Sequence, residues 1–178
     1  MWMGKIISFV LCLSLIPFFC QHQVEASDQL NKANLTFVAK VIRIMDGDTM
    51  EVLYKNRPTK IRLAHIDCPE VKKSQPFGQH AKKALSDLCF GQQVMVLGEK
   101  TDRYGRLIAV VVNHQKQIIN QQMIKQGMAW HFKKYSHDPV YANLEIAARK
   151  NKVGLWQDPS PTPPWEWRKP KRLSTVFK

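Results

Sequence analysis

Short segments of this chain alternate polar and apolar residues or are continuously apolar, which is the pattern of strands with a buried face. The five predicted strands are residues 37–45, 50–54, 59–66, 94–97 and 107–112. Residues 55–58 (Lys-Asn-Arg-Pro) have the composition of a turn between the second and third strands. Asn113 and His114 predict another tight turn after the fifth.

Helical spacing appears between the third and fourth predicted strands. The apolar residues there fall at positions i, i+3, i+4 and i+7 of one helix, and they are Ala81, Ala84, Leu85 and Leu88. Gly91 ends this helix. A second helix is predicted over 117–126, ended by Gly127, and a third over 139–150, ending near Gly154.

The order of these elements predicts the fold class. Five short strands with a helix between the third and the fourth are typical of a small Greek-key barrel of the OB type. Closure of the barrel also removes the exposed strand edges that so small a sheet would present. We therefore expect a β-barrel plus α fold, with a five-stranded OB-type barrel and three helices, over residues 37–156.

The segments on either side of this domain differ from it in composition. Residues 27–36 are polar and are expected to be flexible. Residues 157–178 are rich in proline, tryptophan and basic residues, with too many prolines for a helix or a central strand. We expect this C-terminal tail to wrap the surface, with Trp165 and Trp167 as anchors, and then to fray.

Residues 1–26 have the features of a secretory signal peptide. Lys5 is followed by an apolar run over 6–20 and by a polar stretch that ends at Ala26. The run is short for a membrane span, and Pro17 interrupts it. Cleavage after Ala26 predicts a secreted or periplasmic protein, and a retained membrane anchor is the alternative.

The charge of the chain is strongly positive. Lys and Arg number 27 and Asp and Glu number 14, which gives a net charge of +13. Lys5 and Glu25 cancel within the predicted signal peptide, so the excess belongs to the mature chain. This balance favours a polyanionic partner such as nucleic acid or an anionic surface, with simple solubility as the alternative.

Two of the four cysteines, Cys68 and Cys89, lie outside the predicted signal peptide. An oxidising compartment allows a disulfide between them, and two buried free thiols are equally compatible with the sequence. The chain has no Cys-x-x-Cys motif and no Cys/His spacing suited to zinc.

Four short motifs in a fixed order carry the candidate chemistry. They are Asp-Gly-Asp-Thr at 46–49, Arg-Leu-Ala-His-Ile-Asp-Cys-Pro-Glu at 62–70, Phe-Gly at 77–78 and Asp-Arg-Tyr-Gly-Arg at 102–106. Together they hold acidic side chains and arginines that can face one phosphodiester. Carboxylates hold a hard cation, a glutamate handles the proton of a water molecule, and guanidinium groups bind phosphate.

Each motif also has a simpler explanation. Residues 46–49 fit an ordinary β-turn, and residues 102–106 fit a solvated loop. Arg62 stands in an apolar strand and needs a partner, which is either a structural salt bridge to an aspartate or a bound phosphate. Asp67 and Glu70 follow that strand three residues apart, and a cation would relieve their mutual repulsion in one cleft.

The order and spacing of the four motifs resemble those of the staphylococcal nuclease (thermonuclease) family of secreted, calcium-dependent nucleases. Gly-Met-Ala-Trp at 127–130 and Gly-Leu-Trp at 154–156 extend the resemblance, which covers about residues 37–156. No single motif is specific to that family, but the set is highly specific.

The resemblance implies a calcium site and the residues around it. Asp48 and Asp67 match the calcium-binding carboxylates, and the backbone carbonyl of Cys68 would be a third ligand. Many relatives have threonine at that position, and a carbonyl contact survives the change to cysteine. Asp46 and Thr49 are expected to support these ligands without binding the metal themselves.

The resemblance also implies the residues that act on the substrate. Glu70 matches the residue that activates or orients the attacking water, and Arg62 and Arg106 match two arginines that clamp the phosphate. Weaker candidates for binding the nucleotide are Arg103, Tyr104 and Tyr135.

The implied function is calcium-dependent hydrolysis of DNA and RNA to products with 3′-phosphates, by a monomer without a stable protein partner. OB-type barrels stack the bases of single strands on aromatic side chains beside a basic groove, so we expect single strands to be preferred. A non-catalytic nucleic-acid-binding OB module is the main alternative, but it does not require Arg62, Glu70 and Arg106 together. A phosphoesterase for another polyanion or a small nucleotide, and a surface-binding structural protein, are further alternatives.

Overall fold

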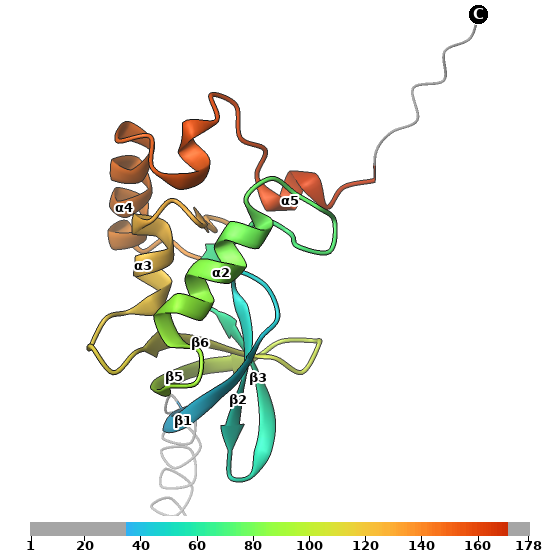
Figure 1. Cartoon of the computed structure of the whole chain (residues 1–178), viewed down its shortest axis with the longest axis vertical. Coiled ribbons are helices and arrows are strands. Elements are labelled where there is room, and N and C mark those ends of the chain that lie inside the picture. The colour runs from blue at the N-terminus through green and yellow to red at the C-terminus, as the bar shows by residue number, and fades with distance from the viewer. Residues whose placement is uncertain (1–34, 171–178) are drawn as a thin grey trace, which may run out of the picture. The chain divides into compact units, whose positions relative to one another are not determined.

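A computed structural model describes residues 35–170, and Figure 1 shows its arrangement. Five strands close into a barrel in the order β1-β2-β3-β6-β5. Their bounds are Leu35–Ile44 (β1), Thr49–Tyr54 (β2), Arg57–Leu63 (β3), Gln93–Thr101 (β5) and Leu107–Val112 (β6). Neighbouring strands are antiparallel except β3 and β6, which pair in parallel. The predicted OB-type barrel is confirmed.

The helices pack outside the barrel. Their bounds are Gly78–Cys89 (α2), Ile119–Lys125 (α3), Pro139–Lys150 (α4) and Pro164–Trp167 (α5), with a 3₁₀ helix at Gly154–Gln157 (η1). Helix α3 contacts β6, α2 and α4 (Figure 1). A second, two-stranded sheet joins β4 (Ile66–Asp67) to β7 (Trp130–His131). Within residues 35–170, no helix has the length and apolar character to cross a membrane.

The alternation of side chains in the strands fills the barrel. In β6, Leu107, Ala109 and Val111 are buried, while the residues between them are partly exposed. Helix α2 adds a stripe at helical spacing, of which Ala81 and Leu85 are fully buried. The core is therefore built from alternate residues of the strands and from the helical stripe that predicted α2.

A buried amide crosses the parallel seam of the barrel. Asn120 of α3 accepts a hydrogen bond from the N–H of Val111 at 2.9 Å. Its amide nitrogen donates to the carbonyls of Ala64 and Ala109 at 3.0 and 3.1 Å. The side chain is fully buried and its amide is hydrogen-bonded through both oxygen and nitrogen, so it ties α3 to β6 and to the residue that follows β3.

Four expectations about the chain need correction or lie outside the described residues. The expected third strand ends at Leu63 instead of residue 66, because His65 adopts a left-handed backbone with φ of 67° and turns the chain into β4. The tail contains a short helix, α5, although no helix was expected there. Pro164 stands at its first turn, where a missing N–H costs no hydrogen bond, so proline begins this helix instead of preventing it. The predicted signal peptide and the fraying end of the tail lie outside residues 35–170.

Cys68 and Cys89 are free, buried thiols and are not bridged. Cys68 donates to the carbonyl of Gly47 at 3.2 Å, and Cys89 donates to the carbonyl of Leu85 at 3.2 Å. Burial raises the pKa of Cys89 to about 12 and raises the pKa of Cys68 well above its ordinary value. Both cysteines therefore act as small packing residues.

Candidate active site

A groove of about 890 Å³ lies beside one end of the β3–β6 seam. Its lining includes all five central candidates, which are Asp48, Arg62, Asp67, Glu70 and Arg106. The register explains part of this convergence, because Ile61 of β3 pairs with Leu107 of β6. Arg62 follows Ile61 and Arg106 precedes Leu107, so this pairing brings the two arginines to one end of the barrel although they are far apart in the sequence.

The turn between β1 and β2 holds Asp48 in place. The N–H of Asp48 donates to the carboxylate of Asp46 at 3.2 Å, and the hydroxyl of Thr49 donates to Asp48 Oδ1 at 3.0 Å. A Cβ at Gly47 would lie 2.7 Å from the Cβ of Ala81 and 2.8 Å from the Cβ of Cys68. Gly47 thus allows the turn to pack closely against α2 and against Cys68.

Arg62 connects the two aspartates at the floor of the groove. Its Nη1 lies 3.0 Å from Asp48 Oδ2, and its Nη2 donates to Asp67 Oδ1 at 2.9 Å. Nη1 also donates to the carbonyls of Leu63 and Ile66, each at 2.9 Å. The structural salt bridge left open by the sequence is therefore present, and it involves both aspartates. Asp48 Oδ2 additionally accepts the N–H of Cys68 at 3.0 Å.

The loop after β4 fixes Glu70 at the edge of the groove. The N–H of Glu70 donates to Gln75 Oε1, and the N–H of Gln75 donates to the Glu70 carbonyl, both at 3.0 Å. A Cβ at Gly78 would lie 2.8 Å from that carbonyl oxygen. The Phe-Gly motif therefore acts on the site indirectly, since Gly78 lets the start of α2 pack against the backbone that carries Glu70.

Arg106 is presented by the hairpin between β5 and β6. Its Nε and Nη2 lie 2.8 and 2.7 Å from Asp102 Oδ2, and Asp102 Oδ1 accepts the N–H groups of Tyr104 and Arg106. Although burial opposes the change, hydrogen bonds from Arg106 and Tyr104 hold the pKa of Asp102 below its ordinary value. Gly105 has φ of 74°, which permits the turn.

The weaker nucleotide-binding candidates also line the groove. Tyr104 and Tyr135 are 66% and 67% exposed, so their rings are available to a ligand. Arg103 donates to the hydroxyl of Tyr104 at 2.7 Å and lies over its ring. The rim of the groove thus combines exposed aromatic faces with positive charge.

Arg168, from the C-terminal tail, also enters the site and was not among the sequence candidates. Its Nη2 lies 2.6 Å from Asp67 Oδ2, and its Nη1 lies 2.6 Å from Glu70 Oε1. Hydrogen bonds to the two carboxylates raise the pKa of Arg168, against the opposing effect of burial. In the sequence, only Trp165 and Trp167 indicated that the tail would pack on the surface of the domain. Nothing in the sequence indicated where the Arg168 side chain would lie.

The acidic groups of the site crowd one another. Burial and the neighbouring carboxylate of Asp48 raise the pKa of Asp46 to about 7. Burial raises the pKa of Asp67 as well, although Arg168 and Arg62 counteract this effect. A cation bound among these oxygen atoms would relieve the repulsion, because hard cations prefer carboxylate and carbonyl ligands.

The donor set fits calcium, with few protein ligands. Among residues 35–170, no three His, Cys, Asp or Glu side chains form a group that can hold a metal alone. A metal would therefore use the carboxylates of Asp48 and Asp67, the carbonyl of Cys68 and water. It would have to share these carboxylate oxygens with the guanidinium groups of Arg62 and Arg168 or displace them. Calcium accepts such a mixture of carboxylate, carbonyl and water oxygens.

The sequence matches proteins that are named as nucleases. Residues 60–158 match the family model described as Staphylococcal nuclease homologue. An uncharacterized endonuclease of Haemophilus influenzae is 48% identical over 139 residues, covering 78% of this chain and 76% of that protein. The micrococcal nuclease of Shigella flexneri is 40% identical, with 78% of this chain and 84% of that protein covered. The staphylococcal-like nuclease CAN1 of Arabidopsis thaliana is 38% identical over 82% of this chain and 43% of its own length.

Proposed function

Because this chain belongs to the staphylococcal nuclease homologue family, whose relatives support a nuclease function, we propose that it is an exported, calcium-dependent nuclease. It would hydrolyse phosphodiester bonds of DNA and RNA, prefer single strands and leave 3′-phosphates. The observation that carries this proposal is the convergence of Asp48, Asp67 and Glu70 with Arg62 and Arg106 on one groove. A binding module has no need for that combination.

Glu70 is assigned the proton-handling role. It lies at the groove edge on a loop that both Gln75 and Gly78 hold in place. From there its carboxylate orients a water molecule in line with the bond to be broken and accepts a proton as the water attacks phosphorus. The groups that fix the loop reduce the reorganisation needed when substrate binds.

Arg106 is assigned the direct phosphate contact. Its side chain is 28% exposed, against 12% for Arg62. Its Nε and Nη2 bond Asp102, so Nη1, for which no bond is described, would bind an equatorial oxygen, on which negative charge builds during attack. Arg62 lines the same groove, but its described bonds go to the protein, so a phosphate contact by Arg62 requires that some of these bonds be exchanged.

Calcium held by Asp48, Asp67 and the Cys68 carbonyl would supply positive charge to the phosphate oxygens and lower the pKa of a bound water. With only two protein carboxylates we expect weak binding, toward roughly 0.1–1 mM as in extracellular calcium modules. This affinity suits an exported enzyme. Export itself rests on the signal-like sequence of residues 1–26.

The preference for single strands rests on the groove rim. Tyr104 and Tyr135 offer exposed rings, and Arg103 adds charge beside them. Unpaired bases can stack on such rings while the backbone follows the positive groove, whereas a rigid duplex keeps its bases stacked inside. Equal cleavage rates on duplex and denatured DNA would contradict this part of the proposal.

The test is cleavage of denatured DNA by the purified full chain, with Ca²⁺ and with a chelator. Cleavage that requires Ca²⁺ and leaves 3′-phosphate ends supports the reaction, the metal and the site together. A folded protein that binds the DNA without cleaving it favours the binding module. Cleavage that persists in chelator contradicts the assignment of Asp48 and Asp67 to a required metal.

A further inference from the structure

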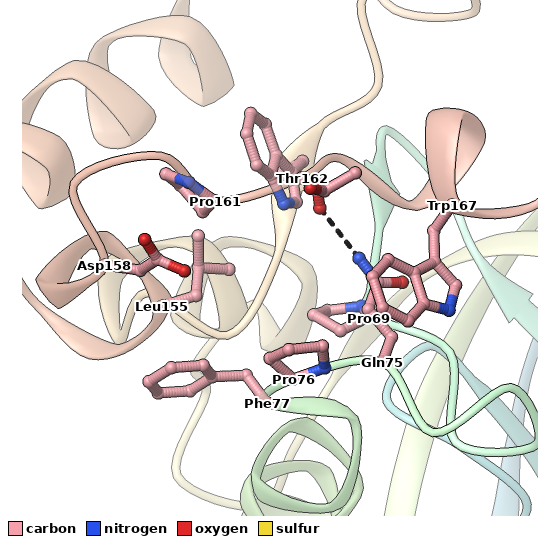
Figure 2. A pocket seen from close by; sticks show the side chains of 10 residues that line it. Pro69, Gln75, Pro76, Phe77, Leu155, Asp158, Pro161, Thr162 and Trp167 are labelled. Carbon is pink, nitrogen blue, oxygen red and sulfur yellow. Dashed lines mark hydrogen bonds between the residues drawn. The ribbon is translucent and has the colours of Figure 1, made fainter.

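The C-terminal tail returns to the loop that carries Glu70. In Figure 2, Pro161, Thr162 and Trp167 of the tail lie opposite Pro69, Gln75, Pro76 and Phe77. The side-chain nitrogen of Gln75 donates to the carbonyl of Thr162 at 2.7 Å, which is the dashed line in Figure 2. Gln75 therefore bonds the tail as well as the backbone N–H of Glu70.

Two tryptophans hold the tail on either side of Glu166. The ring of Trp165 stacks on Phe132 at 5.6 Å with an interplanar angle of 7°, and it also contacts Trp130 edge-on. The indole N–H of Trp167 donates to the carbonyl of Lys73 at 3.1 Å. The Lys73 ammonium in turn donates to the carbonyl of Arg168 at 3.2 Å. These contacts fix the backbone from which the Arg168 side chain extends.

The Arg168 guanidinium bridges two carboxylates of the proposed site. It makes two bonds to Asp67, Nη2 to Oδ2 at 2.6 Å and Nη1 to Oδ1 at 3.2 Å. Nη1 also donates to Glu70 Oε1 at 2.6 Å. The side chain of Asp67 is only 1% exposed, whereas that of Arg168 is 36% exposed, so the carboxylate side of this ion pair is the desolvated one. The planar fork of arginine suits this bridge, which a lysine ammonium cannot reproduce.

We propose that Arg168 is a positioning residue for the nuclease reaction, which sets the orientation of Glu70 relative to Asp67. This inference rests on the proposed function, because it assigns the orientation of the water to Glu70 and metal binding to Asp67. Arg168 holds these two like-charged groups at a fixed separation through one rigid cation. The tail that carries it is therefore part of the site.

The test compares variants at two neighbouring positions of the tail. Arg168→Gln removes the bridge, and Lys169→Gln removes the same charge from a side chain that pairs only with Glu166 in the described contacts. We expect Arg168→Gln to lower kcat about 10–100-fold with little change in KM, as loss of a partner that orients an active-site group does. Lys169→Gln should keep the wild-type kcat.

Two further measurements separate positioning from folding. Arg168→Lys keeps the charge and the tail, and it should lose nearly as much kcat as Arg168→Gln, because its ammonium cannot replace the planar fork. Guanidinium ion at non-denaturing concentration should restore part of the kcat of an Arg168→Ala variant. A purely structural role predicts neither result, and thermal unfolding of each variant monitors the fold.

Several outcomes would overturn the inference. Unchanged kcat in both Arg168→Gln and Arg168→Lys would remove any role in turnover. A higher kcat on loss of Arg168 would make the tail an inhibitory strap, and a higher KM at constant kcat would make Arg168 a substrate-binding residue. If the wild-type chain does not cleave at all, the proposed function fails instead. The bridge itself can still be checked by NMR of ¹⁵N-arginine, in which Glu70→Gln should shift the Arg168 signal.

Discussion

Arg62 and Asp67 form an ion pair in which the carboxylate is almost completely buried, with Nη2 2.9 Å from Oδ1 and the Asp67 side chain 1% exposed. The same guanidinium also serves Asp48 and two backbone carbonyls. Removing one member of a buried pair leaves the other charge buried without a partner. The resulting loss of folding stability is larger than the net stabilisation that the intact pair provides.

The first prediction follows from this pair. Arg62→Ala should lower the free energy of unfolding by about 3–5 kcal/mol, because it removes the buried cation that pairs with two carboxylates and donates to two carbonyls. Arg106→Ala should change it by less than about 1 kcal/mol, since Arg106 is partly exposed and pairs with one aspartate of its own hairpin. Urea unfolding of the two variants makes the comparison. Equal stabilities would mean that the Arg62 network contributes nothing beyond a surface pair.

The second prediction concerns activity without loss of the fold. Arg106→Ala and Glu70→Gln should each reduce kcat on denatured DNA by about 10²–10³-fold, as removal of one charge-stabilising donor typically does. Arg57→Ala, at the exposed start of β3, is the matched control and should keep full activity. A variant within a few-fold of the wild type would exclude that residue from the site.

The third prediction tests the close packing at Gly47. Gly47→Ala adds a methyl group that would lie 2.7 Å from Ala81 Cβ, so the turn, α2 or the loop that carries Cys68 must move. We expect the free energy of unfolding to fall by about 1–3 kcal/mol. We also expect kcat to fall, because the same turn carries Asp48. The control is Gly91→Ala, which has open space around it but a φ of 76°. It should cost stability through backbone strain and leave kcat unchanged.

The fourth prediction concerns the metal in the absence of substrate. Ca²⁺ should raise the melting temperature of the wild-type protein, because a ligand that binds the folded state alone stabilises it by mass action. Asp67→Asn should abolish most of this increase, whereas Asp87→Asn, on the exposed face of α2, should retain it. If Ca²⁺ does not change the melting temperature of the wild-type protein, this result would argue against the proposed ligands.

The fifth prediction concerns pH and the buried His131. Burial is the main cause that lowers its pKa from 6.5, and Lys133 and His65 lower it further, while Glu145 and Asp138 oppose the shift. Its Nε2 bonds to Ser136 Oγ at 2.9 Å, and its Nδ1 finds no partner among the described residues. The unfolded chain therefore binds this proton more tightly than the folded one. Stability is present above pH 6.5 and decreases as the pH falls below that value.

The measurement is the free energy of unfolding between pH 8 and pH 5. Each unit by which the pKa is lowered contributes about 1.4 kcal/mol to this decrease. His131→Gln should flatten the pH dependence, and His114→Gln, at an exposed position, should not. An unaltered slope in His131→Gln would assign the effect to other groups.

The barrel was predictable because its signal is local. The continuous apolar run of residues 107–112 gave the bounds of β6, and the helical spacing in residues 139–150 gave those of α4. The order of the motifs identified the residues that line the groove, but it did not predict the hydrogen bonds and ion pairs among them. The sequence left Arg62 open between a salt bridge and a phosphate contact, and only the packed structure shows that one guanidinium serves two aspartates.

Arg168 could not be found in this way. Its partners, Asp67 and Glu70, lie about a hundred residues earlier in the chain, and their meeting depends on how Trp165 and Trp167 dock. The expected role of these two tryptophans as anchors agrees with their contacts, yet no spacing rule links the anchors to the site. The helix α5 was missed for a related reason, since the proline content argued against a helix that proline in fact begins.

The parallel pairing of β3 with β6 has a kinetic consequence. The chain between two strands that pair in parallel forms a large loop. Closing this loop costs conformational entropy before the strands make any stabilising contact, so such pairings form slowly. Arg62 and Arg106 approach each other only at this step. During refolding, the appearance of an assembled site would therefore report the closure of the barrel, and a chain trapped before that step would contain its helices and hairpins but no place to bind a phosphate.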